Sequence, residues 1–310
     1  MNLTATYYLI KDQWEHKTLE KLEADPGKVI VVTGGSRGLG LSLVHRLLEL
    51  EYSVIIGCRK VEEAKKNIKD LGDLPGRITV LTLDLQNPES VRSFAAEVRK
   101  QADEIEVLIN NAGIMFGPYK ETVDGFEAQF QTNYLSHFLL TSLLFDKIQK
   151  RIVNVSSCSY VPAYYTTDWN DLQKKDFYTP EGGYGTSKAA QILFTKFLQA
   201  KINDSPCYGD TDLSVFSLHP GMIYTDLYVH TPSFLFKPIS NTLMKSKEQG
   251  AETILHAALS KELEGHGGAY TEKSSIVETT AFCSDLANQK KLWDMSLSYL
   301  NMDKFADGLE

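Results

Sequence analysis

Cysteine is scarce in this sequence, and its histidines are widely spaced. The four cysteines, Cys58, Cys158, Cys207 and Cys283, include no Cys-x-x-Cys pair, and the seven histidines include no His-x-x-x-His spacing. A disulfide framework or a zinc site usually shows such close spacings. The sequence therefore predicts no disulfide and no metal, which is typical of a protein in a reducing compartment.

Long apolar runs and blocks of basic residues are also missing. No stretch of about 18 apolar residues occurs, so no membrane-spanning helix is expected. The formal net charge of −8 and the pI near 5.5 disfavour a nucleic-acid partner, which would need a basic surface. The first apolar run, at residues 7–10, follows no basic residue, so no secretory signal is expected. We therefore expect a cytoplasmic protein.

From Lys28 onward, short apolar runs alternate with helical patterns. The runs have the length of strands: KVIVVTG (28–34), SVIIGCR (53–59), ITVLTLD (78–84), VLINNAG (107–113), RIVNVSS (151–157) and LSVFSLHPG (213–221). Uninterrupted apolar strands between helices indicate a parallel sheet covered on both faces. The predicted fold is a single doubly wound Rossmann-type α/β domain over residues 28–310, with a mostly parallel sheet and helices on both faces. Residues 1–27 are expected to be an extension, helical in part between residues 11 and 24.

A glycine-rich turn joins the first strand to a helix. TGGSRGLG, residues 33–40, precedes Leu43, Val44, Leu47 and Leu48, which keep helical spacing. Glycines permit a tight turn and let a pyrophosphate approach the backbone N–H groups at the helix N-terminus, where the helix dipole favours an anion. No Lys-Ser/Thr pair follows these glycines, which argues against a P-loop. The turn predicts a nucleotide site, with a purely structural tight turn as the alternative.

The end of the second strand bears on the choice of dinucleotide. An NAD site usually has an acidic residue there for the ribose hydroxyls. IIGCRK (55–60) has none and carries Arg59 instead, and Arg37 lies within the glycine turn. Two guanidinium groups near the adenosine ribose would pair with the 2′-phosphate of NADP. The expected cofactor is NADP(H), and two unrelated surface arginines are the alternative.

Tyr184 and Lys188 stand four positions apart in GGYGTSKAAQILF (182–194), at the start of what we interpret as an amphipathic helix. Residues i and i+4 share one helix face, so the lysine ammonium can lie beside the phenol. A free phenol titrates near about 10, and a neighbouring cation favours its ionised form. The pair predicts an acid and base that work nearer neutral pH. Taken alone, it also fits an exposed helix pair.

Together these motifs resemble those of the short-chain dehydrogenase/reductase family. The family's Thr-Gly-x-x-x-Gly-x-Gly is matched by residues 33–40, its Asn-Asn-Ala-Gly by residues 110–113, and its Tyr-x-x-x-Lys by Tyr184 and Lys188. The likeness covers about residues 28–280. Its details are most similar to the branch that holds the retinol dehydrogenases, the WW-domain oxidoreductase and the X-chromosomal dehydrogenase/reductase, and they lie in DGFE (124–127), NYLSHFLLT (133–141) and LHPGMIYTDL (218–227).

The resemblance also implies the residues of the site. The catalytic set would be Ser157, Tyr184, Lys188 and Asn133: Tyr184 moves the proton, Ser157 polarises the substrate oxygen, Lys188 favours phenolate and binds the nicotinamide ribose, and Asn133 fixes a water that links Lys188 to solvent. Asp84 would contact the adenine and Thr225 the carboxamide. The full set of implied cofactor contacts is Gly34, Ser36, Arg37, Gly38, Leu39, Gly40, Arg59, Asp84, Leu85, Asn110, Asn111, Ala112, Gly113, Tyr184, Lys188, Pro220, Gly221, Ile223 and Thr225. The stretch between Ser157 and Tyr184 is longer than in many family members, but this branch shares such an insert, so an intact site is expected.

The expected function is hydride transfer between NADP(H) and a carbonyl or alcohol of a small lipophilic substrate. The segment at about residues 226–248 contains TPSFLFKPISNTLMK (231–245), whose apolar residues suit a retinoid, a steroid or an aliphatic aldehyde or ketone. The same residues can equally rest peripherally on a membrane or pack on the core. The alternative function is a cofactor-binding scaffold or regulator, which an intact Ser, Tyr, Lys and Asn set disfavours. A homodimer is left open as the assembly.

Overall fold

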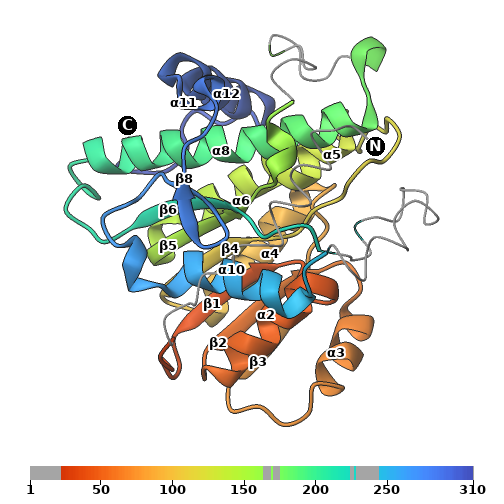
Figure 1. The fold of residues 1–310 in the computed structure, drawn as a ribbon, viewed down its shortest axis with the longest axis vertical. Coiled ribbons are helices and arrows are strands. Elements are labelled where there is room, and N and C mark those ends of the chain that lie inside the picture. Colours follow the sequence, from red (N-terminus) through yellow and green to blue (C-terminus); the bar gives the residue numbers. More distant parts are fainter. Residues whose placement is uncertain (1–21, 163–168, 170–174, 224–226, 228–243, 310) are drawn as a thin grey trace.

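The computed structural model of the protein describes residues 22–162, 169, 175–223, 227 and 244–309. Figure 1 shows a central twisted sheet with helices on both sides. Within the described residues, eight strands form this sheet in the order β3-β2-β1-β4-β5-β6-β7-β8. The strands are β1 (Val29–Thr33), β2 (Ser53–Cys58), β3 (Arg77–Thr82), β4 (Ile105–Asn110), β5 (Ile148–Val155), β6 (Ser214–His219), β7 (Tyr270–Glu272) and β8 (Ser275–Val277).

Neighbouring strands are parallel from β3 to β7, and β8 is antiparallel to β7. The chain winds outward from β1 in one direction through β2 and β3, and in the other through β4 to β7. The strand order therefore reverses between β1 and β4. In open α/β sheets, ligands bind beyond the carboxyl ends of the strands at such a reversal.

The helices of the described residues are short to medium in length, except for one that spans 25 residues. They are α2 (Gly38–Glu49), α3 (Val61–Lys69), α4 (Pro88–Gln101), α5 (Ala128–Phe130), α6 (Ser136–Leu144), α8 (Pro180–Asp204), α10 (Lys247–Leu259), α11 (Ala281–Ser284) and α12 (Leu286–Tyr299). The π-helical turn η1 (Gln131–Leu135) joins α5 to α6. The described residues also contain four 3-10 turns, at Phe145–Lys147, Cys158–Tyr160, Lys175–Phe177 and Lys261–Leu263.

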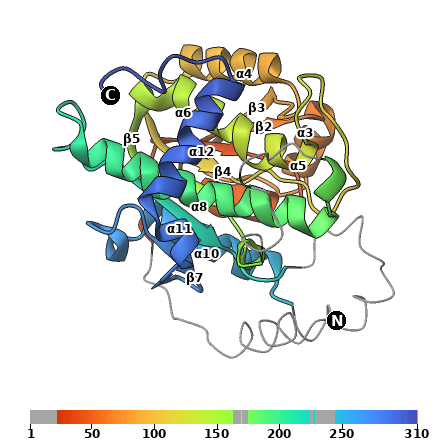
Figure 2. The same ribbon diagram turned by 90° about the horizontal axis from the view of Figure 1, so that it is seen from above.

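Alternate strand residues pack into two separate cores, one on each face of the sheet. Val31 of β1 belongs to the core under α4, α6 and α8, while its neighbours Ile30 and Val32 belong to the core under α2 and α10. Figure 2, which views the molecule from above, shows α12 crossing over α8. Trp293 of α12 packs against the ring of Phe197 at 5.2 Å between centroids. Helix α8 is therefore enclosed between the sheet and a further helix.

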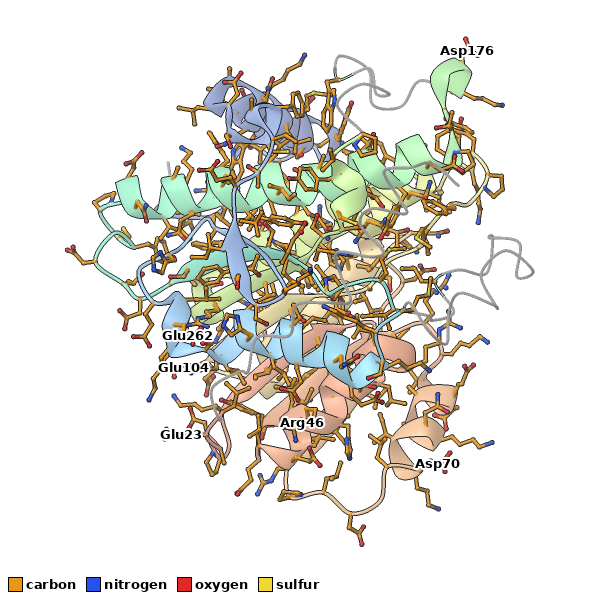
Figure 3. The ribbon with its side chains drawn as sticks, viewed as in Figure 1. Glu23, Arg46, Asp70, Glu104, Asp176 and Glu262 are labelled. Atoms are coloured by element: carbon orange, nitrogen blue, oxygen red, sulfur yellow. The ribbon has the colours of Figure 1, made fainter. Side chains whose placement is uncertain are left out.

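Helices α2 and α10 lie side by side over one face (Figure 1). Arg46 of α2, labelled in Figure 3, donates from Nε to Glu252 of α10 at 2.8 Å. The pair is partly exposed, so it adds little to stability. Closer to the site, a Cβ on Gly250 of α10 would lie 2.0 Å from Ile223, so the glycine is what lets α10 approach the segment after β6.

The predicted fold class and all six predicted strands are confirmed. Strands β7 and β8 were not predicted, because each has three residues and shows no usable periodicity. The helix predicted at Tyr184 is confirmed as α8, but its predicted amphipathic character is wrong: every residue from Tyr184 to Thr195 is buried, since α8 is covered on both sides. The helix expected at residues 11–24 lies outside the described residues except for residues 22–24, which are not helical.

Candidate active site

The glycine turn packs tightly against the loop that follows β4. Gly34 has a φ of +73°, and a Cβ there would lie 2.9 Å from the Cα of Ala112. A Cβ on Gly40 would lie 2.1 Å from the carbonyl oxygen of Gly34. Asn111 Nδ2 donates to the carbonyl oxygen of Thr33 at 2.9 Å, which ties the two loops together. Helix α2 begins at Gly38, so the positive end of its dipole lies beside this turn.

A cavity of about 1360 Å³ runs along this edge of the sheet. A pocket for a single small ligand typically has about 300–1,000 Å³, so this one has room for two ligands together. Its walls include most of the residues that the sequence predicts for the site: Gly34, Ser36, Arg37, Gly38, Leu39, Gly40, Arg59, Asp84, Leu85, Asn111, Ala112, Gly113, Ser157, Tyr184, Lys188, Pro220, Gly221 and Ile223. Residues predicted from separate stretches of sequence thus share one surface.

Three cations lie at the end of the cavity next to β2. Arg37 and Arg59 are both exposed side chains on its wall, and Lys60, which the sequence reasoning missed, lines the same wall. Lys60 Nζ lies 3.0 Å from Glu63 Oε2, and its hydrogen bond lowers the pKa of that carboxyl, with a smaller contribution from Arg37. Glu63 lines the same wall, so three cations and one carboxylate leave this end of the cavity with a net positive charge, which can hold an anionic group.

Tyr184 and Lys188 are buried together on the first turns of α8. Their exposed fractions are each 4%, which rules out the alternative of an exposed surface pair. Lys188 Nζ lies 5.5 Å from the centroid of the Tyr184 ring and donates to the carbonyl oxygen of Val155 at 2.7 Å. Burial lowers the pKa of Lys188 to about 7. The lysine therefore changes charge near neutral pH, next to a phenol in the same cavity.

Ser157 caps the N-terminal end of the 3-10 turn after β5 and lines the cavity. Its hydroxyl accepts from the backbone N–H of Ser159 at 3.2 Å and donates to the Ser159 hydroxyl at 3.3 Å. The second bond is long, so the hydroxyl can rotate and donate to a ligand instead.

Asn133 lies behind the cavity wall, in the π-helical turn η1, and is fully buried. Its side chain accepts from the backbone N–H of Ile114 at 2.8 Å and donates to the carbonyl oxygen of the same residue at 3.0 Å. A Cβ on Gly113 would lie 3.2 Å from Asn133 Oδ1 and 3.7 Å from Lys188 Nζ. Asn133 therefore holds the loop of Gly113 and Ile114 directly over the catalytic lysine candidate. Turns of the π type are frequent at functional sites.

Comparison with known proteins shows the family of the chain. Residues 28–167 match the family described as short chain dehydrogenase. The polyprenol dehydrogenase of Danio rerio is 35% identical over 92% of this chain and 90% of its own length, and retinol dehydrogenase 14 of Homo sapiens is 37% identical over 87% and 85%. The chain belongs to the short-chain dehydrogenase family. A crystal structure of a putative uncharacterized protein from Mycobacterium Paratuberculosis aligns with a TM-score of 0.75 and 29% identity, covering 93% of this chain and 98% of that one.

This short-chain dehydrogenase is an oxidoreductase that acts on CH–OH or C=O groups. Within the described residues, no helix combines the length and the apolar character needed to cross a bilayer. The same residues contain no cluster of three His, Cys, Asp or Glu side chains suited to a metal.

Two implied contacts of the dehydrogenase need correction or remain open. Asn110 does not line the cavity: it is fully buried within the sheet, where Nδ2 donates to Asn154 Oδ1 at 2.9 Å and to Thr141 Oγ1 at 3.1 Å. It is the last residue of β4, so its side chain turns into the core while the following residue faces the crevice. Thr225 lies outside the described residues, as does most of the predicted substrate segment, 226–248.

A strained loop beside Tyr184 was missed by the sequence reasoning. Phe116 has a φ of +57°, which is costly for a residue other than glycine, and its ring meets that of Tyr184 edge-on at 5.4 Å. Its N–H donates to Gln129 Oε1 at 2.7 Å, and Tyr178 Oη donates to the carbonyl oxygen of Gly117 at 2.6 Å. Gln129 Nε2 in turn donates to Tyr178 Oη at 2.6 Å. These bonds hold the Phe116 ring against Tyr184. No local sequence pattern predicts them.

Proposed function

We propose that this dehydrogenase uses NADP(H) to interconvert a carbonyl and an alcohol on a lipophilic substrate, with Tyr184 as general acid and base. The observation that carries the proposal is the joint burial of Tyr184 and Lys188 on the wall of a cavity that also reaches the glycine turn. A proton donor and a dinucleotide site then face the same enclosed space. That arrangement is what proton-coupled hydride transfer requires.

The residues present fit a dinucleotide. The glycine turn leaves no room for side chains at Gly34 and Gly40. Helix α2 begins at Gly38, on the cavity wall, so a pyrophosphate would lie at the positive end of its dipole. Arg37 and Arg59 would hold a 2′-phosphate, and Lys188 would bond the nicotinamide ribose. When bound, the dinucleotide supplies or takes up the hydride. The protein has to move the accompanying proton.

In this proposal Tyr184 transfers the proton to or from the substrate oxygen. On reduction its hydroxyl gives a proton to the substrate oxygen, and on oxidation the phenolate takes one from the alcohol. Ser157 donates a hydrogen bond to the same oxygen, which stabilises the charge that develops there. The ammonium of Lys188 favours the phenolate, because an opposite charge nearby stabilises the ionised form.

The substrate class follows from the cavity wall and from the relatives. Beyond the predicted cofactor contacts, the wall includes Met115, Phe116, Val161, Pro162, Met222 and Leu227. Such a lining suits an apolar molecule. Two relatives are named for polyprenol and retinol. We therefore propose a retinoid, a steroid or an aliphatic aldehyde or ketone as substrate.

The proposal is tested with purified protein, NADPH or NADH, and one member of each class: retinal, a steroid ketone and a long-chain aldehyde. Oxidation of NADPH in preference to NADH, with at least one of the three, is the expected result. Tight NADPH binding without turnover on any carbonyl, or on the matching alcohols with NADP, would instead favour the cofactor-binding scaffold.

A peripheral membrane contact is proposed at Phe234, Leu235 and Phe236. These residues lie outside the described part of the chain, so the support is their apolar sequence and their position shortly after Leu227 of the cavity wall. Replacing all three with serine is expected to reduce co-sedimentation with phosphatidylcholine vesicles, because apolar area is lost at about 25 cal/mol per Å². Activity on a short, water-soluble aldehyde should stay unchanged. Equal vesicle binding by the triple variant and the wild type would contradict the contact.

A further inference from the structure

Gln191 lies one helical turn beyond Lys188 on α8 and is buried, with 1% of its surface exposed. Its Oε1 accepts from Lys188 Nζ at 3.2 Å, and its Nε2 donates to the main-chain carbonyl oxygen of Asn133 at 2.8 Å. Both ends of the amide are therefore used, one on the lysine and the other on the π-helical turn. The resemblance to the family implies that Asn133 fixes a water that links Lys188 to solvent. In this protein the Gln191 side chain bridges Lys188 Nζ and the main-chain carbonyl oxygen of Asn133.

The lysine depends on few acceptors. An ammonium has three donors, and among the described residues two acceptors lie within hydrogen-bond distance of Lys188 Nζ: the carbonyl oxygen of Val155 and Gln191 Oε1. Since the group is buried, each lost acceptor costs more than it would in water. Gln191 therefore contributes to where Nζ sits and to how well its charge is tolerated.

A chain of hydrogen bonds continues from Asn133 to the cofactor loop. His137 Nδ1 lies 2.9 Å from the carbonyl oxygen of Asn133, and its Nε2 lies 2.9 Å from Thr33 Oγ1. Thr33 Oγ1 accepts from the backbone N–H groups of Asn111 and Ala112, each at 3.0 Å, so its own proton goes to His137. The imidazole must then carry its proton on Nδ1 and donate to Asn133. Burial lowers the pKa of His137 to about 4, so it stays neutral in this role near neutral pH.

We propose that Gln191 is a positioning residue: its amide holds Lys188 Nζ in place for the proton transfer of Tyr184 and connects it, through Asn133, His137 and Thr33, to the loop Asn111–Gly113. The inference rests on the proposed function and adds a residue to it. It predicts that the cofactor loop and the lysine move as one unit. It also predicts that the charge of Lys188 responds to the group at position 191.

The direction of that response can be worked out. Methionine matches glutamine in size but accepts no strong hydrogen bond, so Gln191→Met removes an acceptor from the ammonium and lowers the pKa of Lys188 further. Glutamate keeps the shape but adds a negative charge, so Gln191→Glu raises that pKa. Among the described residues, two titratable groups lie near enough to Lys188 to interact with it: Tyr184 on the same helix, and His137 on α6, whose pKa the charge of Lys188 lowers. His137 is neutral near neutral pH. A change in the charge of Lys188 therefore changes the pKa of Tyr184.

The first experiment follows the charge itself, without dinucleotide. Lysine labelled with ¹³C at Cε is titrated by NMR, with the Lys188 signal assigned through Lys188→Met. The expected midpoint is lower by about one pH unit in Gln191→Met, which matches the loss of one hydrogen bond to a charged group, and higher in Gln191→Glu. Gln199→Met is the matched control, because Gln199 is also buried on α8 but bonds Asn203 and the N–H of Val215 instead. An unmoved midpoint in both Gln191 variants would overturn the proposal.

The second experiment measures alcohol oxidation with NADP as a function of pH. Gln191→Met is expected to lower kcat near neutral pH about tenfold, because fewer molecules carry the ammonium that favours phenolate. The rising limb of the profile should move to higher pH, and the KM for the alcohol should stay the same. Adding Gln191→Met to Lys188→Met should cost nothing more, since residues that act through one group are not additive. A full additional loss in the double variant would also overturn the proposal.

The two proposals fail in different ways. If the wild type turns over no substrate but the Lys188 midpoint shifts as expected, the proposed function fails and the positioning of Lys188 by Gln191 stands. If the wild type is active but neither the midpoint nor the pH profile responds to Gln191, only the positioning role fails.

Discussion

Replacement of Tyr184 by phenylalanine is expected to lower turnover by at least about a hundredfold, the usual size of a lost general acid, while NADPH binding and the fold stay nearly intact. The ring keeps its volume and its edge-on contact with Phe116 at 5.4 Å, so packing hardly changes. The glycine turn and Lys188, the proposed cofactor contacts, are left in place. Only the hydroxyl that carries the proton is gone. The loss should therefore fall on kcat and not on the affinity for NADPH.

The measurements are steady-state rates in both directions, NADPH binding by fluorescence and the thermal unfolding midpoint. Tyr119→Phe is the matched control, because it removes a phenolic hydroxyl that bonds Glu121 at 3.0 Å and does not line the cavity. That control should keep wild-type turnover. Turnover of Tyr184→Phe within tenfold of the wild type would remove Tyr184 from the proposed role, whatever the control shows.

The sheet was predictable because its strands contain short apolar runs, such as Val29–Val32 of β1. Ile30, Val31 and Val32 all have to be apolar, since alternate residues enter cores on opposite faces of the sheet. The same logic fails for β8, whose Ile276 and Val277 are exposed, and for β7, which has three residues only. The same reasoning gave a wrong prediction for α8, whose charged and polar residues indicated a face exposed to solvent. Lys188 and Gln191 are polar but buried, because they bond to each other and to the backbone.

The site was predictable where a residue type is forced by local geometry. Gly34 and Gly40 have no room for a Cβ, so the glycine pattern appears in the sequence itself. The supporting residues were not predictable in this way. Gln129, His137 and Gln191 act through hydrogen bonds to other segments of the chain. Such bonds produce no periodic pattern in the sequence. For Gln191 one signal existed: its spacing of three from Lys188 places both on one helix face.

Replacing both Arg37 and Arg59 with glutamine is expected to reduce the preference for NADPH over NADH strongly. Each charge-assisted hydrogen bond to the 2′-phosphate contributes about 1.5–3 kcal/mol, so one or two lost bonds correspond to at least about a tenfold change, and to about a hundredfold or more if two are lost. The loss should appear as a higher KM for NADPH with little change for NADH, because NADH lacks that phosphate. Lys60 on the same wall is retained, so some preference should remain.

The check is the ratio of kcat/KM for NADPH to kcat/KM for NADH, measured at low and at moderate salt. Exposed arginines outside the cavity provide the control: Arg77→Gln with Arg92→Gln removes the same net charge from the surface at a distance from the cavity wall. If general electrostatic attraction explained the preference for NADPH, the Arg77 and Arg92 variant would lose as much of it as the Arg37 and Arg59 variant. Added salt would then cancel the effect of both double variants. If two arginines bind the phosphate directly, only the Arg37 and Arg59 variant loses the preference, and the loss persists at moderate salt. An unchanged ratio in that variant would mean that the 2′-phosphate, or the adenosine end as a whole, lies elsewhere along the cavity.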